Sequence, residues 1–447
     1  MAAAPVAPRT AALRVMRDPM RVALFLLTVV TVSRVHQHWP FIARLRPALL
    51  LVFAVAAYAA LNTKSLSREA LLATRPARLV ALFAALACGS AVFGISLGNS
   101  GFFILSSYSK TIVYAFLLIA AIRHAADLYT FVWAYVVSSG ILVFFAQFVF
   151  GLSRSSGSQA ERLSDLYTYD ANDLGLVLLV GVALTLWLFP IATRWQRVFL
   201  SILLFGCGST LARTGSRGAF LGTIATGVGL LLFVNSVSLL KRVAFIVAAT
   251  ATLAVGAPAG YWAQMQTILA PKEDYNYTSR DGRKEVVKRG IGYMSAYPIF
   301  GIGIANFAKA ECSISDKAQQ HLFGTHIRCI APHNSYVQAG AELGVPGLIV
   351  WLLLVFGSMR EMRRLRKRLP PAWARGDPEQ RFLYSSTSYL PVALLGFAVT
   401  SFFISFAYMD PIYIMCALMA GVYVSINHRL RRDVAASAAL EAPPATG

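Results

Sequence analysis

Charged residues are scarce in this sequence, and acidic ones are the scarcest. The 447 residues include 41 Lys and Arg but only 20 Asp and Glu, and all charged residues together make up 14% of the chain. A soluble globular domain carries about 25%, so the composition excludes an ordinary water-soluble protein. Hydrophobic residues reach 57% and the mean hydropathy is +0.60. Both values are typical of a helical membrane protein.

The sequence also lacks compact metal motifs, an evident internal repeat and a cleavable signal peptide. The spacing of His321, His326 and His333 fits no tight zinc motif, and we find no Asp-rich metal motif. We therefore expect neither a metal nor a cofactor. No small-residue cleavage site follows the first apolar run, so we expect the first helix to serve as its own insertion signal.

Apolar stretches of the length that spans a bilayer, about 20 residues, recur along the chain. They predict an all-α polytopic membrane protein with about twelve transmembrane helices and one long external loop. The predicted spans are 20–36, 47–61, 79–97, 102–122, 129–151, 173–191, 197–212, 218–237, 243–262, 335–356, 385–408 and 411–427.

The net charge of +21 is distributed between the apolar stretches. This pattern indicates the positive-inside rule rather than binding to nucleic acid. Basic clusters lie before the first span, over 62–78, over 357–381 and in the tail at Arg429, Arg431 and Arg432. We expect all of these clusters and both termini in the cytoplasm. Arg34, Arg44 and Arg46 are exceptions, because this topology places them at an external loop.

Four regions follow from the topology. Residues 1–262 hold nine spans, 263–334 form an external loop domain, 335–433 hold three spans with a basic cytoplasmic loop, and 434–447 are a small-residue, Pro-rich tail expected to be disordered. Cys312 and Cys329 lie in the external loop. An oxidising compartment would permit a disulfide between them. Cys88, Cys207 and Cys416 lie in apolar helices and are expected to be packing residues.

Several cationic or titratable side chains face the outer side of this topology. Arg213 and Arg217 lie between the seventh and eighth spans, and Arg217 has glycines beside it where a helix begins. A helix N-terminus with close backbone approach suits a phosphate. Snorkelling to the interface is the alternative for both arginines.

Arg283 and His333 face the same side. Helical periodicity places Arg283 on the apolar arc of its segment, whereas Lys284, Lys288 and Arg289 form a solvated face in which Glu285 and Arg289 are spaced as a surface pair. An inward-pointing arginine needs an anionic partner, either a ligand or a structural carboxylate. His333 precedes the tenth span together with Asn334, and an imidazole accepts protons near neutral pH. A hydrogen-bonded structural histidine is the alternative.

A further polar cluster, Asp170, Asn172 and Asp173, stands at the entry to the sixth span. One of the three is expected to cap that helix. Three such residues, with Arg162 upstream, exceed what a cap needs, and polar groups at membrane depth indicate function.

Four segments together resemble the bacterial O-antigen ligase and polymerase family. They are YDANDLGL (169–176), TGSRGAFLG (214–222), DGRKEVVKRGIGYMSAYPIFGIGIANF (281–307) and APHNSYVQAGAELGVPGL (331–348). The resemblance implies a metal-independent, inverting glycosyltransferase of the multi-helix C type in the bacterial inner membrane. Such an enzyme takes a glycan from undecaprenyl diphosphate at the periplasmic face and places it on lipid A–core.

The resemblance also assigns roles to residues. The essential arginines of the family correspond to Arg217 and Arg283, and its histidine to His333. Arg217 and Arg283 would neutralise the diphosphate, and His333 would take or orient the acceptor proton. We expect the substrate-binding residues to include Arg213, Asn334, Tyr336, Asn172 and Asp173 as well.

Three other functions stay open at the level of sequence. A polymerase that joins carrier-linked repeats shares the architecture and the arginines, and a glycan ligase that acts on protein is a further possibility. A secondary transporter would also show twelve helices, but it should show paired broken helices in two related halves.

Overall fold

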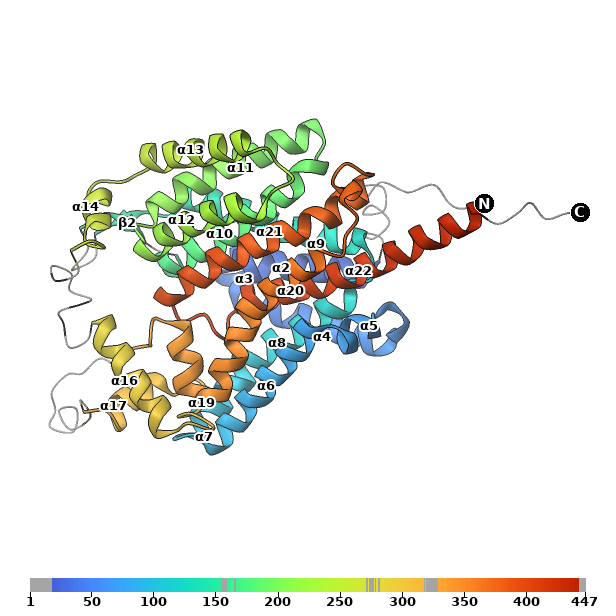
Figure 1. Cartoon of the computed structure of the whole chain (residues 1–447). Coiled ribbons are helices and arrows are strands. Elements are labelled where there is room, and N and C mark those ends of the chain that lie inside the picture. Colours follow the sequence, from blue (N-terminus) through green and yellow to red (C-terminus); the bar gives the residue numbers. More distant parts are fainter. Residues whose placement is uncertain are drawn as a thin grey trace, which may run out of the picture.

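The computed structural model describes residues 18–154, 159–164, 166–270, 272, 277, 279, 282–316, 318 and 329–441, with side chains as far as residue 435. Within these residues the protein is a bundle of helices (Figure 1). The only strands in the described part are β1 (Leu152–Ser153) and β2 (Arg162–Leu163), which pair antiparallel.

The principal helices follow the order of the predicted spans. They are α2 (Pro19–Ser33), α4 (Pro47–Leu61), α6 (Arg75–Phe93), α7 (Leu97–Phe103), α8 (Ser109–Ala121), α9 (Ala125–Phe148), α10 (Ala171–Leu188), α11 (Arg194–Arg213), α12 (Arg217–Phe233), α13 (Leu239–Val255), α14 (Tyr261–Gln266), α16 (Arg283–Ala296), α17 (Phe307–Ser313), α19 (Ser335–Leu352), α20 (Ser358–Arg366), α21 (Pro378–Thr400) and α22 (Asp410–Glu441).

Shorter elements connect these helices. They are η1 (Val35–His38), α3 (Pro40–Arg44), η2 (Thr63–Ser65), α5 (Arg68–Ala73), η3 (Ile104–Tyr108), η4 (Phe189–Ile191), η6 (Leu353–Gly357), η7 (Pro371–Ala374) and η8 (Ser401–Phe403). The turns η3 and η6 are π-helical and join α7 to α8 and α19 to α20 without a gap.

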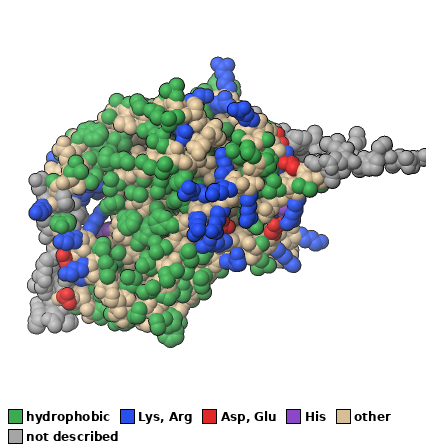
Figure 2. All heavy atoms as spheres, viewed as in Figure 1, with side chains coloured by type: hydrophobic (Ala, Val, Ile, Leu, Met, Phe, Trp, Pro, Cys, Tyr) green, Lys and Arg blue, Asp and Glu red, His purple; other side chains and the backbone are tan. Residues whose placement is uncertain are grey.

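The helices confirm an all-α polytopic membrane protein. Eight of those described are long and apolar enough to cross a bilayer, and three shorter apolar helices, α2, α4 and α12, accompany them. Figure 2 shows hydrophobic side chains over the middle of the visible face, with Lys and Arg gathered toward the side on which α22 ends. The exact number of crossings, and which end faces the cytoplasm, stay predictions.

The core of the bundle is built around its last two long helices. About four-fifths of the membrane-length window is buried in each of α21 and α22 (83%). α21 packs against α10, α12 and α20, and α22 packs against α6, α8 and α9. At the opposite end of the molecule from the end of α22 lie α14, β2, α16 and α17 (Figure 1). We call this the loop end.

α19 is broken inside the bundle, which the sequence did not reveal. Gly344 has φ 73° and ψ −173°, and Pro346 follows. The segment 298–303 fills the break: Ile302 N donates to Ala341 O at 2.9 Å, and Val345 N donates to Pro298 O at 2.8 Å. A Cβ at Gly344 would lie 2.6 Å from Pro298 O, so only glycine suits this position.

The end of the chain differs from its expected disorder. α22 continues to Glu441, so residues 434–441 are helical. Half of this stretch is Ala, and it ends in Leu and Glu; all three residue types favour helix. The rest of the predicted disordered tail, residues 442–447, lies outside the described residues.

Candidate functional site

Arg217 is the first residue of α12 and faces the loop end. The turn before it contains Gly215 with φ +56°, and the Ser216 hydroxyl caps the helix by accepting from Ala219 N at 3.1 Å. Nη1 of Arg217 donates to Oγ1 of Thr267, just after α14, at 2.7 Å. The half-buried guanidinium is therefore held at the positive end of a helix.

Arg283 is likewise the first residue of its helix, α16. Its guanidinium carbon lies 5.9 Å from the centre of the Phe403 ring. Phe403 also lies against the start of α12, because a Cβ on Gly218 would come within 2.7 Å of the Phe403 Cβ. The Phe403 side chain in η8 thus packs against the helix that begins at Arg217, and the same ring faces the guanidinium of Arg283.

His333 stands immediately before α19 with a left-handed backbone (φ 46°). This conformation is uncommon outside glycine, although histidine is among the residues enriched in it. The His333 side chain keeps some contact with solvent. The protein around it still removes much of its hydration, which lowers the pKa of the imidazole; the Arg283 guanidinium lowers this pKa further, and Asp170 raises it. His333 is accordingly neutral at neutral pH and lies within electrostatic reach of both α16 and α10.

Arg162, on β2, joins the two sides of the site. A Cβ added to Gly215 would lie 3.2 Å from the Cβ of Arg162, so Arg162 lies beside the turn that leads to Arg217. Burial lowers the pKa of Arg162; Asp170 opposes this effect and Arg217 adds to it. Arg217, Arg162, Asp170, His333 and Arg283 therefore form one electrostatically connected group, which we call the loop-end cluster.

Asn172 and Asp173, predicted as substrate ligands, are occupied in a helix cap. Oδ1 of Asp170 accepts from Asn172 N at 2.6 Å and from Asp173 N at 2.8 Å. In return, Oδ2 of Asp173 accepts from Asp170 N at 3.1 Å. This reciprocal pairing is a capping box. The capping alternative accounts for these contacts, and substrate binding by the two residues stays a prediction.

Asn334 and Tyr336 also have structural contacts. Oδ1 of Asn334 caps α19 by accepting from Tyr336 N at 2.9 Å and Val337 N at 3.0 Å. The Tyr336 hydroxyl donates to Ala398 O at 2.9 Å, and its ring stacks on Phe402 with centroids 4.2 Å apart. Both side chains are buried. They fix the start of α19 next to His333, and substrate contact by them stays a prediction.

Arg213 is the last residue of α11, one turn before Arg217. Its Nε is buried without a hydrogen-bond partner among the described residues. Arg213 lies four residues before Arg217 in the sequence, and its role in substrate binding stays a prediction.

Arg34, an exception to the positive-inside rule, is half-buried near acidic and aromatic groups. Its guanidinium carbon is 4.3 Å from the centre of the Tyr169 ring. Burial lowers its pKa, but Tyr169, Asp410 and Asp173 together outweigh that effect, and the net pKa is raised. Because nearby acidic groups balance its charge, Arg34 can occupy this position on either side of the membrane. Tyr169 and Asp173 flank Asp170, so Arg34 borders the loop-end cluster.

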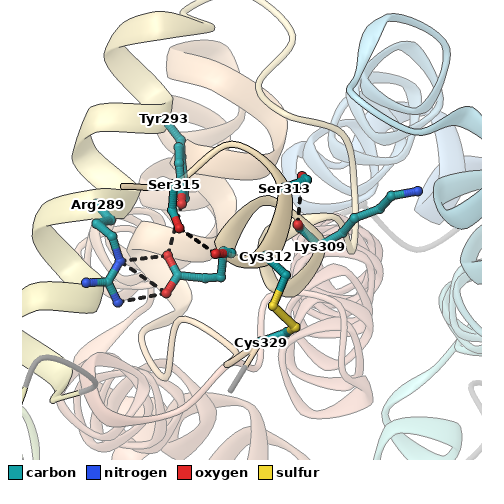
Figure 3. The surroundings of a disulfide bond; sticks show 8 residues. Arg289, Tyr293, Lys309, Cys312, Ser313, Ser315 and Cys329 are labelled. Carbon is teal, nitrogen blue, oxygen red and sulfur yellow. Dashed lines mark hydrogen bonds and ion pairs between the residues drawn. A yellow bond between two sulfur atoms is a disulfide. The ribbon is translucent and has the colours of Figure 1, made fainter. Parts of the chain in front are cut away.

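The loop domain contains a disulfide and an ion pair (Figure 3). Cys312 and Cys329 are joined, with Cα atoms 5.5 Å apart. Arg289, expected to pair with Glu285 on a solvated face, instead binds the fully buried Glu311, with Nη2 to Oε2 at 2.7 Å. Sequence spacing suggested the nearest carboxylate; the fold brings a better-buried one from α17.

Metal ligation has no support in the described part of the chain, where no group of three or more His, Cys, Asp and Glu side chains is placed to hold an ion. The zinc alternative involved His321 and His326, which lie outside the described residues. The sequence analysis did not predict Phe403, and it named Arg34 and Arg162 without predicting their places beside the site. A phenylalanine after an apolar helix looks like a lipid-facing residue, and nothing in its neighbours indicates otherwise.

Comparison with known families gives one match. Residues 202–352, about a third of the chain, match the family model described as O-antigen ligase. This segment contains Arg213, Arg217, Arg283 and His333, together with both bridged cysteines. No curated protein matches the chain.

Proposed function

Because residues 202–352 of this chain belong to the O-antigen ligase family, we propose that the protein is a membrane glycosyltransferase that moves a glycan from undecaprenyl diphosphate to lipid A–core. We place the reaction at the periplasmic face of the bacterial inner membrane, with inversion at the anomeric carbon. The observation that carries the proposal is the loop-end cluster, in which two helix-starting arginines and a neutral histidine come together at the end of apolar helices.

The arginines suit a lipid diphosphate as leaving group. Negative charge grows on the oxygen between sugar and phosphorus as the glycosidic bond breaks. Guanidinium groups bind phosphate oxygens in bidentate geometry, and the N-termini of α12 and α16 add positive potential at Arg217 and Arg283. Charge stabilisation of this kind is usually the largest single contribution to catalysis.

His333 suits the proton transfer. Its pKa is lowered by desolvation and by Arg283, so the imidazole is unprotonated at neutral pH and can accept the proton of the acceptor hydroxyl. The hydroxyl oxygen then forms a bond to the anomeric carbon as the bond to the diphosphate breaks on the opposite face. Undecaprenyl diphosphate leaves with the bonding electron pair, and His333 later releases its proton to water.

The place of the cluster suits a membrane-anchored donor. Arg217, Asp170 and His333 stand at the ends of α12, α10 and α19, which are apolar helices of the bundle. A polyprenyl chain between helices would then present its diphosphate at the height of the arginines, with the glycan lying under the loop domain.

The test is complementation of a strain that lacks the gene. We expect Arg217→Ala, Arg283→Ala and His333→Ala each to lower glycan transfer by about 100-fold or more. Lys288→Ala, an exposed change on the outer face of α16, is the matched control and should retain transfer. Intact transfer in both Arg217→Ala and His333→Ala would falsify the proposal.

The glycolipids of the deletion strain separate this function from its alternatives. A ligase predicts carrier-linked polymer that accumulates beside unmodified lipid A–core. Single repeats on the core would instead identify a polymerase, and altered solute uptake without a glycolipid change would identify a transporter. The break in α19 has no counterpart that we find in the first half of the described helices, whereas the transporter alternative requires paired breaks.

A further inference from the structure

The short helix α17 contacts the two helices next to Arg283 and His333. It packs against α19, which His333 precedes, and is joined through Glu311 to α16, which begins at Arg283 and itself packs on α19. Figure 3 shows Arg289 and Tyr293 of α16 turned toward the end of α17, with the disulfide next to them. These contacts are polar and covalent as well as apolar, so α17 is fixed on more than one side.

The first attachment joins α17 to α16 through Glu311. Arg289 binds its carboxylate with both Nε and Nη2, at 2.8 and 2.7 Å, and the Tyr293 hydroxyl donates to Oε1 at 3.0 Å. The Glu311 side chain has no exposed surface. A buried bidentate pair fixes orientation as well as distance, so it sets the rotation of α16 about its own axis.

The second attachment joins α17 to α19 through Glu342. Its carboxylate accepts from Ala305 N at 3.0 Å and from Phe307 N, the first residue of α17, at 3.1 Å. Glu342 lies two residues before the break at Gly344, and Ile302 N and Gly303 N donate to Ala341 O and Glu342 O in the same segment. The start of α17 is therefore bound to the buried part of α19.

The third attachment is covalent. Cys312 follows Glu311 directly, and its partner Cys329 lies four residues before His333. The bridge thus connects the end of α17 to the segment that leads to the histidine. α17 is consequently tied at its start to α19, along its length to α16 and at its end to the His333 segment.

We infer that α17 is a positioning element that holds Arg283 and His333 in one arrangement through Glu311, Glu342 and the Cys312–Cys329 bridge. The alternative is that direct packing of α16 on α19 suffices, since Gly290 already lies against Val337 and Phe307. This inference rests on the proposed function, because Arg283 and His333 matter for transfer only if they act in it. The positions of the two residues relative to each other can nevertheless be measured without an assay of transfer.

The measurement is the titration of His333. The groups that act on its imidazole are Arg283 from α16 and Asp170 from α10. If α17 keeps Arg283 close, loosening α17 removes a nearby positive charge, and the His333 midpoint rises. Diethyl pyrocarbonate acylates neutral imidazole, so the pH dependence of acylation at His333, followed by peptide mass spectrometry on the full-length protein in detergent, reports the midpoint.

Two variants let the direction of the shift in the His333 midpoint test the inference. Glu311→Gln deletes a negative charge, which by long-range electrostatics alone would lower the midpoint; displacement of Arg283 would raise it. The double variant Cys312→Ser/Cys329→Ser changes no charge, so any rise comes from displacement of His333 relative to the protein that desolvates it or relative to Arg283. We expect both to raise the midpoint by a few tenths of a pH unit and to lower kcat for transfer by about 10- to 100-fold.

Glu285→Gln is the matched control, an identical change on α16 for which we find no contact with α17 in the described residues. An unchanged or lowered midpoint in both test variants, in samples shown to be folded by a monodisperse elution profile, overturns the inference. Failure of the proposed function is recognised separately, because it requires intact transfer in Arg217→Ala and His333→Ala, whereas the His333 midpoint does not depend on transfer.

Discussion

His333 shows how much a single residue owes to its neighbours. Its backbone is left-handed, and Asn334 next to it caps α19. Desolvation and then Arg283 lower its pKa, and Asp170 raises it. Strained backbone at a reactive residue persists only where the surroundings fix it. Here the cap and the tether through Cys329 supply that fixation, and they hold the imidazole next to α16.

Replacing Asp170, which caps α10, with an uncharged residue tests the effect of its charge on the pKa of His333. Asp170 raises the pKa of His333, so Asp170→Asn removes a stabiliser of the protonated form and lowers that pKa. Asn caps helices about as well as Asp, so α10 should stay intact. We expect the acid limb of the transfer rate, which falls as His333 becomes protonated, to move to lower pH by a few tenths of a unit.

The pH profile of kcat/KM for the free enzyme checks this expectation. Glu285→Gln serves as a control for an acidic residue lost elsewhere on the loop domain. A limb that stays in place, or moves to higher pH, would show that Asp170 does not act on the titrating group.

At this scale the sequence predicted Arg217, Arg283 and His333 as site residues, and the structure places them in the loop-end cluster; it did not predict the structural contacts of their neighbours. The same amide that could hold a sugar hydroxyl can cap a helix, and only the position of the helix boundary decides. Helix boundaries from sequence are uncertain by several residues, so Asn172 and Asn334 could not be assigned. Phe403 was missed because an aromatic residue after an apolar helix carries no polar signal.

Among the elements, α16 depends on close approach to its neighbours. Gly290 faces α19 and α17: an added Cβ would lie 2.3 Å from Val337 Cγ1 and 3.0 Å from the Phe307 ring. Two residues further on, Gly292 has nothing within 4 Å of such a Cβ. The two glycines are thus a natural matched pair on one helix, one needed for packing and one not.

Alanine substitutions at these two positions should have opposite effects. Gly290→Ala overpacks the contact and should lower the free energy of unfolding by about 1–3 kcal/mol, with reduced transfer because α16 moves away from α19. Gly292→Ala should raise the free energy of unfolding by up to about 1 kcal/mol through helix propensity.

Thermal unfolding in detergent, followed by the loss of monodisperse protein, measures both changes. Equal melting temperatures for the two variants would contradict the close packing of α16 on α19.

Periodicity and hydropathy located most of the long helices but not the break in α19. The apolar run continues through Gly344 and Pro346, and a hydropathy window averages across them. What makes the break possible is the 298–303 segment, which supplies backbone hydrogen bonds there. That partner comes from another part of the chain, so no local pattern can report it.

At the scale of the molecule, the face seen in Figure 2 has charged residues toward both ends and apolar side chains between them. The orientation inferred from basic loops predicts that the loop end faces the periplasm. Lys288 at the loop end and Arg368 after α20 are both exposed, so each can be replaced by cysteine in a Cys88→Ser background.

We expect a membrane-impermeant maleimide to label Lys288→Cys in intact spheroplasts and Arg368→Cys only after the membrane is opened. Mass tagging of the purified protein reads out both. Labelling of the two sites in the reverse pattern would show that the protein has the opposite orientation in the membrane.

The connection between α21 and α22 lies beyond the family match, which ends at residue 352, yet it is built into the site. The Ser335 hydroxyl donates to Ile404 O at 2.7 Å and accepts from Phe406 N at 2.9 Å, and Gln338 accepts from Ala407 N at 3.1 Å. Arg162 and Asp170 lie before the match. A fragment cut at the family boundaries would therefore lack Arg162 and Asp170 of the loop-end cluster and the 404–407 segment that binds the start of α19, so the smallest piece worth expressing runs from the start of α2 into α22.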